Sequence, residues 1–241
     1  MLRTVFTTLA LGSFFVCWGS VSTSAQEKET QKTDSPAGTT APAAPQPRRD
    51  RWLVKTASDP DAFKIKRTAQ LTTIEKLLAM PRPKELPLDG SNDAYQARRT
   101  APVEMTVYSV EADVVECQLM RDGDYRVTLK GASGKTLILE MPDPAPEFVS
   151  SDSPFAYAIK AAREQFNSRA KPEKTPTLLH AHARITGIGY FARAFGKQKP
   201  EGNLVQLHPV LLIDWMEKPS KEFAQAAEKE QSRAPAEAKK P

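Results

Sequence analysis

The chain has 241 residues and a formal net charge of +5, a balance that at first suggests a nucleic-acid partner. The positive charge lies in the flanks, because residues 26–100 carry a net charge of +4 whereas residues 101–216 carry −1. A nearly neutral central segment argues against binding to a phosphate backbone, so a nucleic-acid partner is not expected. Of the two cysteines only Cys117 lies outside the first 25 residues, which excludes an intramolecular disulfide once those residues are removed.

Residues 1–25 have the composition of a signal peptide. A single charge, Arg3, precedes an apolar run that is too short to span a bilayer, and Ala25 suits signal peptidase. We therefore expect a secreted or periplasmic protein with no transmembrane segment after cleavage. Lipidation of Cys17 is the alternative, although Phe15 and Val16 stand where small residues should precede a lipidated cysteine.

The mature chain divides into four parts by composition. Residues 26–50 are rich in Thr, Ala, Pro, Gln and Lys and predict a disordered linker. Residues 51–100 predict an extension that packs on the main domain, with a short helix opened by the capping sequence Thr72 to Glu75. Residues 101–216 contain the main domain. Residues 217–241 predict a solvated tail that is disordered or transiently helical.

Alternating and β-branched residues predict five strands in the main domain. They are Val103–Glu116, Tyr125–Lys130, Thr136–Met141, His180–Phe191 and Leu204–Trp215. Between the third and fourth strands, Ser153 and Pro154 open a helix in which Phe155, Ile159 and Phe166 share one face. The glycines of the fourth strand and Pro209 in the fifth indicate a bend or bulge.

This order, β-β-β-α-β-β, is that of an OB-like fold. We therefore predict a mainly β (α+β) domain, a five-stranded Greek-key barrel with one helix between strands three and four. Another small half-open barrel or an α+β sandwich would contain the same elements. Cys117 lies in an alternating stretch, so we interpret it as a buried apolar residue and not as a catalytic thiol.

Several motifs of the chain resemble those of a group of uncharacterised exported bacterial proteins with an OB-like core. The motifs are DGDYRVTL at 122–129, PDP at 142–144, SPF at 153–155, TGIGYF at 186–191 and LHPV at 207–210. An N-terminal segment, Lys55-Thr56 to Asp61-Ala62, also fits. The resemblance implies the fold and export but no activity. The chain departs from the group at residues 192–197 and at Gln206, where relatives carry other polar residues.

Two sets of residues are candidates for a site around the second strand. Asp122, Asp124, Arg126 and Glu140 could form a degenerate nuclease-like centre, in which carboxylates hold a metal and an arginine stabilises the transition state. An ordinary hairpin turn would use the same Asp and Gly residues. A ligand-binding face could instead comprise Arg126, Thr128, Lys130 and His208.

Histidine spacing raises a further possibility, because His180 and His182 lie on one face of a strand and could hold a metal with His208. No established catalytic motif is present, which argues against an enzyme, and no cofactor is expected. The sequence thus favours an exported OB-type module that binds an envelope or extracellular polymer, glycan or protein. The alternatives are a hydrolase with a degenerate nuclease-like barrel and an accessory subunit tethered by flexible arms.

Overall fold

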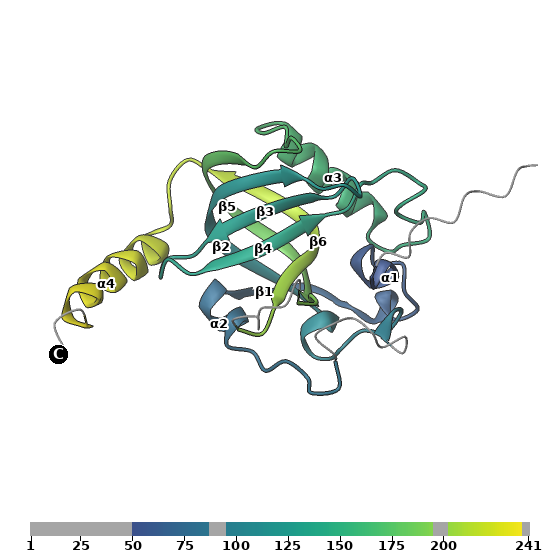
Figure 1. Cartoon of the computed structure of the whole chain (residues 1–241), viewed down its shortest axis with the longest axis horizontal. Helices are drawn as coiled ribbons and strands as arrows, with labels where there is room; N and C mark the ends of the chain where they lie inside the picture. Colours follow the sequence, from purple (N-terminus) through teal and green to yellow (C-terminus); the bar gives the residue numbers. More distant parts are fainter. Residues whose placement is uncertain (1–49, 87–94, 195–201, 238–241) are drawn as a thin grey trace, which may run out of the picture. The chain divides into compact units, whose positions relative to one another are not determined.

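The structure, a computed structural model, describes residues 50–86, 95–194 and 202–237. The expected signal peptide and linker lie outside these ranges. A six-stranded mixed sheet dominates, and helices are few (Figure 1). None of the helices in the described ranges is long and apolar enough to cross a membrane.

The sheet has the strand order β1-β2-β3-β4-β6-β5, and β2 also pairs with β5. The strands are β1 (Lys66–Thr72), β2 (Thr106–Leu119), β3 (Tyr125–Lys130), β4 (Thr136–Met141), β5 (Thr177–Phe191) and β6 (Val205–Met216). Strands β2 to β6 therefore form a closed ring, and β1 is added to it in parallel with β2. The ring also contains one parallel contact, between β4 and β6.

The prediction of five strands missed β1. All but the last of its seven side chains are exposed, so the stretch KRTAQLT lacks the apolar alternation that marks a strand. Strands β3 and β4 have the predicted bounds, whereas β2 begins three residues later than predicted because Val103–Met105 form a turn of 3-10 helix.

Glycines in β5 allow the predicted bulge beside Pro209. A Cβ atom at Gly187 would lie 3.0 Å from the carbonyl oxygen of Pro209, and one at Gly189 would lie 2.5 Å from that of Val103. The register between β5 and β6 shifts at both glycines. Close backbone approach therefore requires glycine here, and the predicted bend is confirmed.

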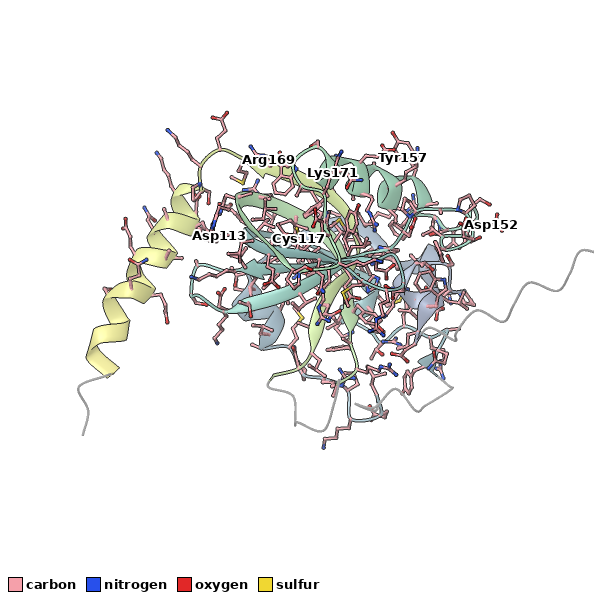
Figure 2. The ribbon with its side chains drawn as sticks, turned by 45° about the horizontal axis from the view of Figure 1, so that its top comes forward. Asp113, Cys117, Asp152, Tyr157, Arg169 and Lys171 are labelled. Atoms are coloured by element: carbon pink, nitrogen blue, oxygen red, sulfur yellow. The ribbon has the colours of Figure 1, made fainter. Side chains whose placement is uncertain are left out.

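Helix α3 (Ala156–Asn167) lies between β4 and β5 in the chain and packs mainly against β6. Ile159 and Phe166 are buried, whereas Tyr157 is 87% exposed and points away from the body (Figure 2). The helix begins later than predicted, because the Ser153 hydroxyl donates to the carbonyl of Ala57 at 2.7 Å. That hydrogen bond fixes the residues before α3 to the N-terminal extension.

The main core fills the inside of the ring. Val110, Leu129, Leu139 and Ile185 are at most 1% exposed, and Cys117 lies with them as a free, buried thiol (Figure 2). Burial, with a smaller contribution from the charge of Glu116, raises the pKa of that thiol. The residue therefore contributes to packing, as its position in the sequence indicated.

The extension packs against the outer face at β5, pairs with β2 and contributes side chains to the main core. It contains α1 (Trp52–Lys55), a 3-10 turn (Ala62–Lys64), β1 and α2 (Ile74–Leu78). Val54 of α1 packs with Tyr190 and Ala192 in a cluster separate from the main core. Residues 205–210 of β6 are consequently buried along their whole length, even though successive side chains of a strand point to opposite faces.

The C-terminal residues form helix α4 (Lys221–Glu237), where the sequence indicated at most a transient helix. Its first turn is attached to β2, since the backbone N–H of Ser220 donates to Glu111 at 2.7 Å. Phe223 packs edge-on against the ring of His182, with centroids 4.7 Å apart. Beyond this turn the described side chains are largely exposed.

Candidate metal centre

Three buried side chains from separate parts of the sheet converge on one point. Asp124, Glu140 and His208 each offer a ligand atom, and these atoms all lie within 4.8 Å of one another. His208 Nδ1 is 3.2 Å from Glu140 Oε2, and His208 Nε2 is 4.0 Å from Asp124 Oδ2. The group therefore has the size of a metal coordination shell.

Strand register explains why these residues meet. Tyr125 pairs with Met141 in the β3–β4 hairpin, so Asp124, just before β3, lies near the end of β4. Leu139 of β4 is paired with Leu207 of β6, and both belong to the core inside the ring. The residues that follow them, Glu140 and His208, consequently lie side by side on the outer face, under the N-terminal extension.

The converging atoms lack hydrogen-bond partners. His208 is 0% exposed and Asp124 1%, yet neither ring nitrogen nor Asp124 Oδ2 forms a hydrogen bond within the described residues. A buried polar atom without a partner costs about 1–3 kcal/mol, and such atoms are rare in folded proteins. Two of these atoms, His208 Nε2 and Asp124 Oδ2, face each other at 4.0 Å, which indicates that a ligand between them satisfies both.

The protonation states suit a cation. Burial, together with the charges of Asp122 and Glu140, raises the pKa of Asp124 to about 7. Burial also acts to raise the pKa of Glu140, but contact with His208 and the charges of Lys55 and Arg126 outweigh it and lower that pKa to about 2.

Burial lowers the pKa of His208 against the opposing effect of Glu140. At neutral pH the cluster therefore contains an unprotonated imidazole, one ionised carboxylate and one carboxyl that readily loses its proton. A metal ion requires these forms of its ligands.

The extension supplies the surroundings of the cluster. The Tyr190 ring lies edge-on to His208 at 5.4 Å, and Lys55 Nζ is 4.0 Å from Glu140 Oε2. The guanidinium of Arg51 lies 5.0 Å from the centre of the Tyr190 ring. These contacts fix the orientation of His208 and Glu140 from the side opposite the core.

An open depression of about 1040 Å³ gives access to two of the three ligands, Asp124 and Glu140. Its remaining lining residues are Asp50, Lys55, Gln118, Leu119, Met120, Arg121, Asp122, Gly123, Arg126, Lys174 and Arg193. A cation in the cluster would thus have protein on one side and solvent on the other. That arrangement distinguishes catalytic metal sites from closed structural ones.

The structure brings together the four residues of the expected nuclease-like centre. Asp124 and Glu140 are in the cluster, while Asp122 and Arg126 line the depression beside it. The expected ligand-binding face is divided instead. Lys130 lines a different depression, and Thr128 lines neither of the two. His208, which was expected on the same binding face, belongs to the buried cluster instead.

The three histidines do not meet. His182 pairs with Met216 at one end of β6, whereas His208 lies near the other end. His182 is held between two carboxylates, with Nδ1 2.7 Å from Asp113 and Nε2 3.0 Å from Glu111 (Asp113 is labelled in Figure 2). His180 is exposed in a depression beside it.

Sequence reasoning found the carboxylates and the histidine but assigned them to different sites. The missing information was the parallel contact between β4 and β6, which places Glu140 beside His208. Lys55 and Tyr190 were not recognised as neighbours of the site, because nothing in the sequence fixes where the extension packs. No protein-family model and no curated protein sequence matches the chain.

Proposed function

We propose that the protein is an exported hydrolase that depends on a divalent cation held by Asp124, Glu140 and His208. The observation that carries the proposal is the convergence of three ligand atoms within 4.8 Å, with both His208 nitrogens and Asp124 Oδ2 lacking hydrogen bonds within the described residues. A mixed set of imidazole and carboxylate ligands suits Zn²⁺ or Mn²⁺ better than Ca²⁺.

The ring of strands β2 to β6, with α3 between β4 and β5, supports an OB-type barrel as the scaffold. The motifs shared with uncharacterised exported bacterial proteins and the composition of residues 1–25 support export. In this scheme the ring holds the ligands, and the extension covers the site on the side opposite the core.

Asp124, Glu140 and His208 would hold the cation, and the depression that reaches Asp124 and Glu140 would admit water to it. A bound divalent cation lowers the pKa of such a water and polarises the group under attack. With such a cation bound, a hydroxide oxygen would form a bond to the electrophilic centre, and the bond to the leaving oxygen would break. The proton lost by the water goes to solvent, and the leaving oxygen takes one from solvent.

The sequence favoured a binding module without a metal. That function does not explain why buried polar atoms of His208 and Asp124 lack hydrogen bonds within the described residues. A hydrolysis assay distinguishes the hydrolase from the binding module. It uses a panel of p-nitrophenyl acetate, phosphate, phosphodiester and glycoside substrates. We expect Zn²⁺- or Mn²⁺-dependent release of nitrophenol from at least one of them, abolished by EDTA and restored by added metal.

Glu140→Gln should abolish this activity while the circular dichroism spectrum stays unchanged. The matched control is Asp113→Asn, which alters a carboxylate beside His182, away from the centre. Activity that survives both chelation and Glu140→Gln, or no activity with any substrate and metal, would overturn the proposal.

A further inference from the structure

Unpaired cations surround the opening of the proposed centre. Arg121, Arg126 and Lys174 line the depression from three different segments, and none forms an ion pair or side-chain hydrogen bond with another described residue. Elsewhere in the described chain the buried arginines have partners, since Arg51 and Arg99 are each matched by a carboxylate and Arg163 donates to two backbone carbonyls. The depression is also lined by Asp50, Asp122, Asp124 and Glu140, but none of these forms an ion pair with the three cations, which are therefore available to a ligand that brings negative charge.

Arg126 is the cation best placed to act on a substrate. It is the direct ladder partner of Glu140, and both side chains line the same depression. A group bound to a cation on Glu140 would therefore lie next to the guanidinium. The planar guanidinium binds two oxygens of a phosphate at once, and a phosphoryl group also offers an oxygen to the metal.

None of the described residues that line the depression is aromatic. Proteins that bind single-stranded nucleic acid through its bases usually stack those bases on aromatic rings. The lining therefore fits recognition of phosphates without recognition of bases, and its volume of about 1040 Å³ exceeds the size of a single phosphate ester.

We infer that the substrate is a phosphodiester-linked polymer, recognised through its phosphates by Arg126, Arg121 and Lys174; this inference rests on the proposed function. In the reaction the hydroxide oxygen forms a bond to phosphorus, and the bond from phosphorus to one ester oxygen breaks. The products are a phosphomonoester and an alcohol, with the protons exchanged with solvent.

The test uses the Mn²⁺-loaded protein with bis(p-nitrophenyl) phosphate, and with single-stranded and abasic oligonucleotides of equal length. We expect hydrolysis of the small diester, equal binding of the two oligonucleotides, and at least a tenfold loss of kcat/KM in Arg126→Gln. The double variant Arg121→Gln/Lys174→Gln should raise the Kd for the oligonucleotides and change kcat for the small diester little. Lys160→Gln, on the exposed side of α3, is the matched control.

Metal affinity, measured separately by titration calorimetry, distinguishes the two proposals. If Mn²⁺ binds but only acetate or glycoside substrates are cleaved, the inferred substrate class is wrong and the proposed function stands. Equal kcat/KM for Arg126→Gln and the unmodified protein would also overturn the inference, as would binding that requires the bases. Absence of metal binding would refute both.

Discussion

At the scale of single residues, buried charges attach the extension to the ring. Arg51 and Glu104 form a bidentate pair, at 2.6 and 2.7 Å, and Glu104 is 0% exposed. Glu104 also accepts hydrogen bonds from the backbone of Thr100 and Phe191. One carboxylate thus connects the extension, the turn before β2 and the end of β5.

Replacing Glu104 by Gln should therefore destabilise the fold strongly. The variant leaves the guanidinium of Arg51 buried without its counter-charge, which costs about 3–5 kcal/mol. Urea unfolding followed by circular dichroism measures the loss. The control Glu164→Gln breaks an exposed pair with Lys160 and should change stability by less than about 0.5 kcal/mol. Similar unfolding midpoints for both variants would contradict this account.

Glu111 predicts a pH dependence. Burial acts to raise its pKa, but contacts with His182, Ser220 and Arg184 outweigh burial and lower the pKa to about 2. Because the folded-state pKa lies below the ordinary 4.5, the ionised carboxylate stabilises the fold above pH 4.5, and this contribution is lost as the pH falls towards 2.

Glu111→Gln should accordingly reduce the free energy of unfolding by about 1 kcal/mol at pH 6, after allowance for solvent screening. The difference from the unmodified protein should shrink steadily below pH 4.5. Urea unfolding of both proteins between pH 6 and pH 3 tests this. A difference that stays constant or grows on acidification would show that the charge of Glu111 is not what matters.

At the scale of elements, α3 connects the ring to the extension through its buried face. Ile159 is 1% exposed and packs with Phe155 and Ile188, whereas Tyr157 is 87% exposed (Figure 2). The sequence predicted this face because its apolar residues recur at spacings of three and four. It could not predict the first turn, where Ser153 bonds to a segment almost a hundred residues away.

Ile159→Ala should cost about 2–5 kcal/mol, because it opens a cavity in a packed cluster. Tyr157→Ala on the same helix should cost less than about 0.5 kcal/mol apart from its small propensity effect. Thermal unfolding of the two variants gives the comparison. Equal losses would mean that α3 does not pack on the ring as the structure has it.

Local sequence patterns were sufficient to predict the strands in which apolar and polar residues alternate strongly. Strands β3 and β4 have the predicted bounds, and the bulge at Pro209 follows from its missing N–H and the nearby glycines. Strand β1 was missed because its side chains are almost all exposed, so it carries no apolar period. Its position depends on backbone pairing with β2, and residue composition does not reveal backbone pairing.

At the scale of the whole described molecule, the candidate site is a product of tertiary structure. Asp124, Glu140 and His208 are separated by 16 and 68 residues in the chain, and only the closed ring brings them together. The extension then buries them by covering the outer face of β6. Sequence alone identified the residue types but could not show which of the three histidines joined the carboxylates.

Titration calorimetry of Zn²⁺ into the metal-free protein tests the central claim most directly. The account predicts one bound ion per chain, with an affinity that falls roughly a hundredfold or more in His208→Gln, since even residues outside the coordination shell change metal affinity by 10–100-fold. His180→Gln, at an exposed histidine, should bind as the unmodified protein does. No binding by the unmodified protein, or equal affinity in His208→Gln and His180→Gln, would contradict it.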